Sequence, residues 1–248
     1  MSQPTAVGPR GPFRDTIEKK LPIANVVTLL QKKILSWKLL AVIVKRAKKR
    51  LNRGDIMQEN LHLEMALATP GFMDEKELAY LATLAGKCKH ILEIGTWRGR
   101  SARAFADNLM DGGSLTCVDT FADNAYGAVF PGDASDLCQH PDWLWKEFHK
   151  NLGDHIGRTV FAARMSSMDG ARCFSDKRYN CVFVDAGHWY EDVRQDILCW
   201  RPLLAEGGIL CGHDYNPIHH PPVIQAVDEF VPKFRVVPKT TIWTTEGI

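Results

Sequence analysis

Apolar and polar segments alternate in blocks from about residue 73 to the end of the chain. The short apolar runs predict buried strands near residues 90–95, 114–119, 159–164, 180–185 and 208–212. Apolar residues at helical spacing predict helices near residues 73–85, 101–110, 142–152, 168–175, 190–204 and 222–230. Residues 234–245 add two strands or a hairpin around Pro238. This alternation favours an α/β fold with a mostly parallel seven-stranded sheet and helices on both faces.

The first 60 residues follow a different pattern. Residues 1–13 are rich in proline and glycine and lack the apolar core of a signal peptide. Between residues 13 and 50, apolar residues recur at helical spacing and predict a long amphipathic helix. Lysines interrupt its apolar run before it reaches the roughly 20 residues needed to cross a membrane. We therefore divide the chain into an N-terminal arm, residues 1–60, and an α/β domain, residues 61–248.

The two parts carry opposite charge. Residues 1–53 hold 13 Lys/Arg and 2 Asp/Glu, a formal charge of +11, whereas the whole chain has a net charge of +2. One interpretation is a helix that lies on an anionic membrane surface through residues 13–53. The other is a helix that packs on the α/β domain or on a second subunit of a homo-oligomer.

The number and spacing of the cysteines indicate whether the protein works in a reducing or an oxidising compartment. There are seven, an odd number, and they are scattered without a Cys-x-x-Cys pair. This usage is typical of a reducing environment rather than of a disulfide framework. We expect a cytoplasmic protein, with peripheral membrane association if the arm binds lipid.

A glycine-bearing turn follows the first apolar run of the domain. The segment reads Glu-x-Gly-x-x-x-Gly-x-Ser, with its named residues at Glu93, Gly95, Gly99 and Ser101, and Thr96 lies inside the turn. A dinucleotide fingerprint would need glycines where Trp97 and Arg100 stand, and no Gly-Lys-Ser/Thr of a phosphate-binding Walker loop is present. The segment resembles motif I of the class I methyltransferases that use S-adenosylmethionine. The resemblance implies a Rossmann-like fold in which these five residues bind the cofactor.

Two later segments are candidates for binding the nucleoside of that cofactor. Asp119 ends the second predicted strand, where nucleotide-binding folds place a carboxylate for the ribose hydroxyls. Ser167 and Asp169 follow the third strand, in the loop from which class I methyltransferases read the adenine edge. The same residue types also cap helices, so a capping role for these side chains stays open.

The ends of the fourth and fifth predicted strands narrow the resemblance. Asp185-Ala-Gly-His188-Trp-Tyr-Glu is followed by Asp196 and Trp200, and residues 203–215 read Leu-Leu-Ala-Glu-Gly-Gly-Ile-Leu-Cys-Gly-His-Asp-Tyr. These segments resemble the methyltransferase 24 family, a branch that acts on small molecules, and the likeness extends over about residues 74–245. Gly187 departs from the family pattern, because a second aspartate usually stands there.

The residue types at these strand ends suggest a reaction. Asp185, His213 and Asp214 could hold a divalent metal, and their oxygen ligands would suit Mg²⁺. His188 is a candidate general base for a hydroxyl, and Asp185 is the second candidate catalytic residue as well as a cofactor contact. Asp185 could instead cap the next turn, and His213 could be a satisfied histidine at a strand end. We expect an O-methyltransferase that acts on a small molecule such as a sugar or secondary metabolite.

Two segments could shape an acceptor site. The aromatic-rich connection over residues 122–145 is long for this fold, which favours a lid. His219-His220-Pro221-Pro222 forms a second rim.

The sequence leaves three other functions open to comparison. The basic arm alone favours a nucleic-acid methyltransferase, but no Asn/Asp-Pro-Pro-Tyr run follows the fourth strand, so we expect no specific nucleic acid. A non-catalytic scaffold on the same fold is a further alternative, although Asp119 and Asp185 are both present. An oxidative enzyme of an antibiotic-type pathway would need a redox metal, for which the sequence offers only a loose His213/Asp214/His219 combination.

Overall fold

The computed structural model describes residues 61–122 and 142–248. The predicted arm, residues 1–60, and most of the predicted lid lie outside these described residues. The membrane-binding and subunit-packing interpretations of the arm therefore stay predictions. Among the helices that are described, none has the length and apolar content that a membrane span requires.

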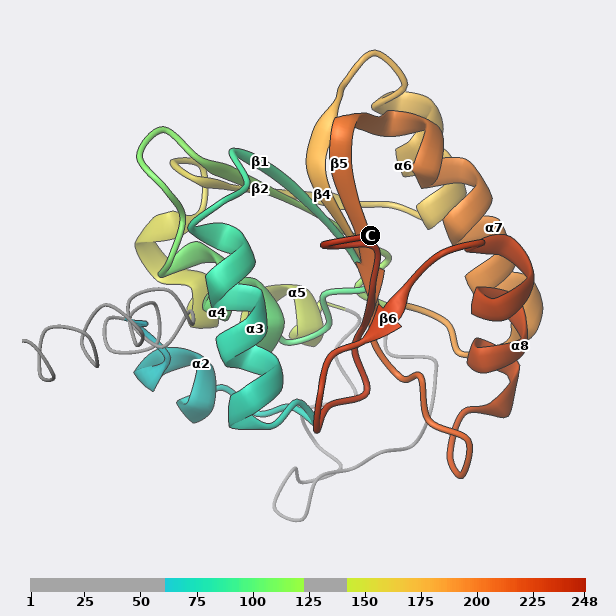
Figure 1. The fold of residues 1–248 in the computed structure, drawn as a ribbon. Helices are drawn as coiled ribbons and strands as arrows, with labels where there is room; N and C mark the ends of the chain where they lie inside the picture. The colour runs from blue at the N-terminus through green and yellow to red at the C-terminus, as the bar shows by residue number, and fades with distance from the viewer. Residues whose placement is uncertain (1–60, 123–141) are drawn as a thin grey trace, which may run out of the picture. The chain divides into compact units, whose positions relative to one another are not determined.

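Seven strands form one sheet within the described residues (Figure 1). They are β1 His90–Ile94, β2 Ser114–Asp119, β3 Val160–Arg164, β4 Tyr179–Val184, β5 Leu204–Gly212, β6 Arg235–Val236 and β7 Trp243–Thr244. Their order is β3-β2-β1-β4-β5-β7-β6. Strands β1 to β5 pair in parallel, and β7 pairs antiparallel with β5 and β6. The predicted α/β fold with a mostly parallel seven-stranded sheet is confirmed.

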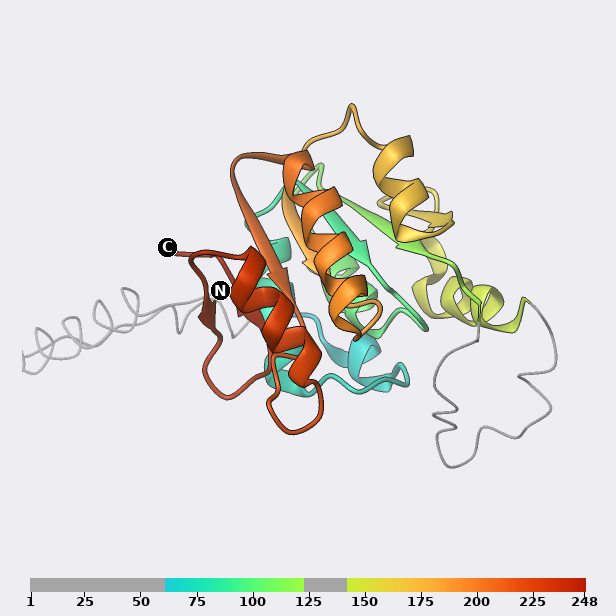
Figure 2. The same cartoon turned by 90° about the vertical axis from the view of Figure 1, so that its right-hand side faces the viewer.

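Helices cover both faces of this sheet (Figure 2). They are α2 Glu64–Ala68, α3 Glu75–Ala85, α4 Arg100–Ala106, α5 Trp143–Leu152, α6 Ser167–Cys173, α7 Tyr190–Trp200 and α8 Pro221–Phe230. Helices α2, α3, α4 and α5 share one hydrophobic core with the sheet, and α7 and α8 share another. Successive residues of one strand pack into opposite cores, as the neighbours Phe183 and Val184 of β4 do. Burial on both faces explains why the strands read as continuous apolar runs.

Several element boundaries differ from the predictions, among them the end of helix α4, which stops at Ala106 rather than near residue 110. The helix predicted for residues 190–204 ends at Trp200, and a single 3₁₀ turn, Arg201–Leu203, follows it. Pro202 lies in that turn and lacks the amide that a continued α-helix would need. Strand β5 begins at Leu204, earlier than predicted, and passes through Gly207 in a left-handed conformation with φ 69°.

The strand order indicates where a ligand-binding site should lie on this sheet. β1 has β2 on one side and β4 on the other, so the crossover connections run in opposite directions from β1. Ligands of open α/β sheets bind outside the carboxyl ends of the strands at such a switch point. The segments that follow β1, β2, β4 and β5 meet at this edge.

Candidate active site

The loop after β1 lies against the end of β4. Gly95 and Gly99 have positive φ angles of 78° and 86°. A Cβ on Gly95 would lie 2.2 Å from the backbone oxygen of Asp185, so a residue with a side chain could not fit there. The structure thus places the predicted cofactor loop, from Glu93 to Ser101, beside Asp185.

Asp119 at the end of β2 holds this loop. One of its carboxylate oxygens, Oδ2, accepts hydrogen bonds of 2.8 Å from the amides of Thr96 and Trp97. The other, Oδ1, accepts a bond of 2.7 Å from the amide of Phe121. A carboxylate has about four lone-pair positions, so these bonds use most of its capacity. Ribose binding by Asp119 stays a prediction, and it requires that ribose hydroxyls share or replace these amide contacts.

Two buried polar atoms lie at the base of the loop. Neither Oε1 of Glu93 nor Oγ1 of Thr96 has a hydrogen-bond partner among the residues that the structure describes. Burial raises the pKa of Glu93 to about 7. Together with the glycine turn, this unused hydrogen-bonding capacity fits a polar ligand such as the predicted cofactor. Ser101, in the first turn of α4, is buried as well.

In the loop after β3, different residues cap helix α6 and occupy the position predicted to contact the adenine edge. Ser166 is the N-cap of α6, and its Oγ accepts a hydrogen bond from the amide of Asp169. The hydroxyl of Ser167 instead donates to Oδ1 of Asp196 and accepts from Nε1 of Trp200 at 2.8 Å. The side chain of Ser167 therefore contacts α7, and its predicted role at the adenine edge is untested.

Asp185, His213 and Asp214 come together where β4 and β5 end. Their candidate ligand atoms all lie within 4.8 Å of one another. Nδ1 of His213 lies 3.1 Å from Oδ1 of Asp214 and 3.5 Å from Oδ1 of Asp185. A small cavity of about 10 Å³ is bordered by these residues together with His188. Sequence spacing predicted this set of side chains, and the structure brings them to one point.

A third carboxylate, which the sequence did not predict at the site, completes the surroundings of His213. Nε2 of His213 lies 3.2 Å from Oε1 of Glu77 on α3. Burial opposes a charge on His213, but Asp185, Asp214 and Glu77 together raise its pKa to about 12. The pKa of Glu77 falls to about 2 against the effect of its burial, because it contacts His213 and the amides of Thr241 and Asp74. The three carboxylates around His213 therefore favour its protonated form.

The donor chemistry fits a divalent cation in part. The carboxylates of Asp185 and Asp214 are ligands that Mg²⁺ accepts. Burial raises the pKa of Asp185, whereas contacts with His188 and His213 hold the pKa of Asp214 below its usual range in spite of its burial. His213 could join them only in its neutral form, so a metal at this set of side chains would have to displace the proton that the surrounding carboxylates favour.

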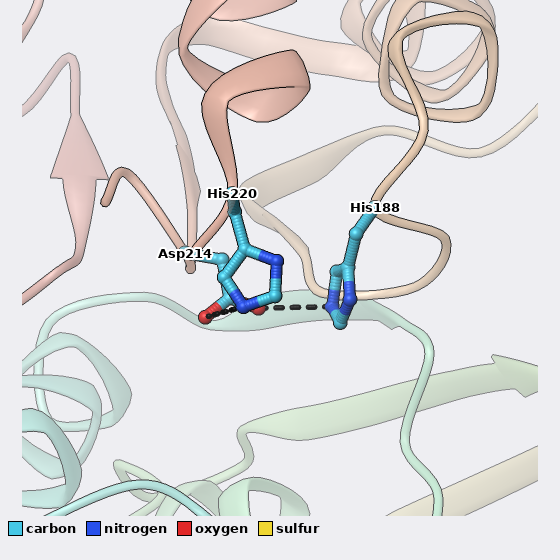
Figure 3. A group of neighbouring side chains, drawn as sticks. All are labelled: His188, Asp214 and His220. Carbon is cyan, nitrogen blue, oxygen red and sulfur yellow. Dashed lines mark ion pairs between the residues drawn. The ribbon is translucent and has the colours of Figure 1, made fainter. Parts of the chain in front are cut away.

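His188 and His220 lie on the other side of Asp214 (Figure 3). Nε2 of His188 is 2.9 Å from Oδ2 of Asp214, and Nε2 of His220 is 3.6 Å from Oδ1. The contact with Asp214 raises the pKa of His188, whereas burial lowers the pKa of His220. The sequence predicts His220 only on a rim of the acceptor site, because nothing in its spacing indicates that it reaches Asp214.

Gly187 has a steric reason to depart from the family pattern. A Cβ at this position would lie 2.4 Å from Oδ2 of Asp192 on α7. An aspartate here would meet both the atoms and the charge of that side chain.

Comparison with known proteins agrees with this fold. The family described as a methyltransferase domain, methyltransferase 24, matches residues 92–215, half of the chain. The comparison with curated proteins finds no match.

Several solved structures are similar. The O-methyltransferase TomG from Streptomyces achromogenes, solved with S-adenosylmethionine, is 15% identical, with a TM-score of 0.51 over 76% of this chain and 86% of TomG. The methyltransferase PaMTH1 from Podospora anserina, bound to S-adenosylhomocysteine, is 15% identical, with a TM-score of 0.51 over 80% of this chain and 94% of PaMTH1. A candidate O-methyltransferase from Klebsiella pneumoniae is 18% identical, with a TM-score of 0.51 over 82% of this chain and 94% of that protein. At these identities the likeness establishes the fold.

Proposed function

The chain belongs to the methyltransferase 24 family of class I S-adenosylmethionine-dependent methyltransferases, and on this premise we propose that it methylates a hydroxyl oxygen of a small molecule. The observation that carries this proposal is the pairing of His188 with Asp214 beside Asp185, at the carboxyl ends of β4 and β5. Substrates of open α/β sheets bind outside these strand ends. A base at this place can therefore meet an acceptor hydroxyl.

The cofactor would be held by the loop from Glu93 to Ser101, with Asp119 at the ribose. When bound, S-adenosylmethionine supplies a methyl group that its sulfonium has already activated. The chain's own residues then have to align the acceptor and remove a proton.

His188 is the group that we assign to proton removal. Asp214 accepts the Nε2–H of His188, which orients the ring and leaves the other ring nitrogen as the basic one. The acceptor oxygen bonds to the methyl carbon as the carbon–sulfur bond breaks, and the hydroxyl proton passes to the imidazole. Since Asp214 raises the pKa of His188, it also strengthens this base.

Asp185 and Asp214 would hold Mg²⁺, which would lower the pKa of the acceptor hydroxyl. What supports this part of the proposal is the pair of carboxylates at neighbouring strand ends. In a reaction without a metal, the protonated form of His213 would partly neutralise these two carboxylates.

The first experiment is calorimetric titration with S-adenosylmethionine and S-adenosylhomocysteine, with and without Mg²⁺. We expect both to bind and Asp119→Ala to weaken binding at least about tenfold, equal to about 1.4 kcal/mol. Absence of binding under every condition would overturn the cofactor assignment.

A second experiment tests the base. A panel of hydroxylated sugars and aromatic metabolites is screened for release of S-adenosylhomocysteine. With an active acceptor, His188→Ala should lower the rate about 100-fold or more while cofactor affinity is retained. His90→Ala is the control, because His90 is an exposed histidine at the amino end of β1, away from the strand ends that carry the site. Unchanged turnover in His188→Ala would remove His188 from the mechanism.

A further inference from the structure

We propose that His188, Asp214 and His220 form a binding site for a divalent first-row transition-metal ion. This site shares Asp214 with the carboxylate pair discussed for Mg²⁺, but its other two ligands are imidazoles. It is a property of these side chains alone and does not rest on the proposed methyl transfer.

The distances between the donor atoms suit one ion. Nε2 of His188 lies 2.9 Å from Oδ2 of Asp214, Nε2 of His220 lies 3.6 Å from Oδ1, and all three donors lie within 4.8 Å of one another. Ligand atoms about 2.0–2.2 Å from a tetrahedral metal are about 3.4 Å apart. Small rotations of the rings would therefore bring the three donors to metal-binding distance. In Figure 3 both rings point toward the carboxylate of Asp214.

The backbone holds His220 over Asp214. Asp214 has a positive φ of 62°, which turns the chain sharply after β5. Oδ1 of Asn216 accepts hydrogen bonds from the amides of Ile218 and His219, and the backbone oxygen of Asn216 accepts one from the amide of His220 at 2.9 Å. His220 is the N-cap residue of α8, which begins with two prolines. The turn is thus closed by its own hydrogen bonds and continues into a helix whose first residues have restricted φ.

The ligand set selects the class of ion. Two imidazoles and one carboxylate are typical of zinc and of other first-row divalent metals, whereas Mg²⁺ prefers oxygen ligands. The imidazole of His213 cannot take the place of His220, because both of its nitrogens face carboxylates.

The three ligand side chains are also accessible. Those of His188, Asp214 and His220 are 32%, 16% and 28% exposed, so an ion can reach them from solvent.

The site has a consequence for the proposed reaction, which holds only if the proposed function is correct. His188 cannot ligate a metal through Nε2 and at the same time donate that nitrogen's proton to Asp214. A bound transition metal should therefore compete with the role of His188 as a base, and Zn²⁺ should inhibit methyl transfer by the wild-type enzyme.

The test is a titration of the full-length protein with Co²⁺ alone. Calorimetry and visible absorption measure the binding. We expect one Co²⁺ per chain, and we expect His188→Ala and His220→Ala each to weaken binding at least tenfold. His219→Ala is the matched control and should bind as the wild type does, because His219 is the adjacent exposed histidine outside the cluster. Circular dichroism of each variant checks that it is folded.

Three outcomes would overturn the site. They are absence of Co²⁺ binding to the wild type, equal losses in His220→Ala and His219→Ala, and wild-type affinity in His220→Ala with a loss in Asp185→Asn. The last result would place the metal on the carboxylate pair. None of these outcomes touches the methyltransferase proposal, which is tested by cofactor binding and methyl transfer.

Discussion

Nε2 of His213, at the end of β5, lies 3.2 Å from Oε1 of Glu77 on helix α3, and both side chains are more than nine-tenths buried. Glu77 is also held by the amide of Asp74 through Oε2 and by the amide and hydroxyl of Thr241 through Oε1. One carboxylate thus joins the start of α3, the segment before β7 and the carboxyl end of β5. This connection favours a positive charge on His213 and fixes the position of its ring.

His213→Gln should destabilise the protein. The substitution removes the positive charge that Glu77, Asp185 and Asp214 surround, and loss of one partner from a buried ion pair costs about 3–5 kcal/mol. Urea unfolding at pH 7 measures the change in free energy. His219→Gln is the control for an exposed site and should change it by less than about 0.5 kcal/mol. A cost below about 1 kcal/mol for His213→Gln would mean that His213 is not the counter-ion of this cluster.

Asp196 should make stability depend on pH. Burial raises its pKa from 3.8 to about 6, so the folded protein binds this proton more tightly than the unfolded chain does. The protonated carboxyl of Asp196 contributes fully to the free energy of unfolding below about pH 4, and this contribution is lost as the pH rises to about 6. The total loss is about 3 kcal/mol, from 1.36 kcal/mol per pKa unit.

Asp196→Asn removes that titration and keeps an oxygen that can accept from Ser167. Urea unfolding at pH 4.5 and pH 7.5 should show the variant gaining stability relative to the wild type at the higher pH. Asp176→Asn, at an exposed aspartate, is the comparison and should track the wild type. A constant difference between Asp196→Asn and the wild type at both pH values would contradict the assigned shift.

Gly95→Ala should lower the free energy of unfolding by more than the strain of its positive φ angle accounts for. Gly95 and Gly112 both have positive φ, 78° and 70°, but only at Gly95 would a Cβ meet other atoms. Gly112→Ala therefore measures the strain of the left-handed conformation, about 1–2 kcal/mol. Gly95→Ala adds the clash with the backbone of Asp185 and should also abolish cofactor binding by calorimetry. Equal costs in the two variants would show that the loop can move away from β4.

Gly187→Asp, which would restore the family's usual residue, should destabilise this protein. The new side chain would meet Asp192, and overpacking of this kind costs about 1–3 kcal/mol. Asp192→Gly in the same chain should recover most of that loss, because it removes the charged carboxylate and also the Cβ, which would lie 2.7 Å from a Cβ at position 187. A double-mutant cycle by urea unfolding measures the coupling, and strictly additive effects would rule out this explanation for Gly187.

The order of strands and helices was predictable from the sequence because it depends on local periodicity. Apolar runs such as residues 90–95 and 180–185 are short and mostly buried, and their length distinguishes them from the longer segments with helical spacing between them. The grouping of Asp185, His213 and Asp214 was predictable for a related reason. Parallel strands all end at one edge of the sheet, so residues just past β4 and β5 must lie close together.

The protonation of His213 and the position of His220 were decided by the tertiary structure. Glu77 has the sequence signature of an acid in the first turn of a helix, and nothing in its spacing places it against His213. His220 reaches Asp214 because Asn216 closes the turn between them. Charge state depends on how many carboxylates surround a side chain and how deeply it is buried. Those quantities come from packing between distant segments, whereas spacing along the chain reports only which element a residue belongs to and which face it shares.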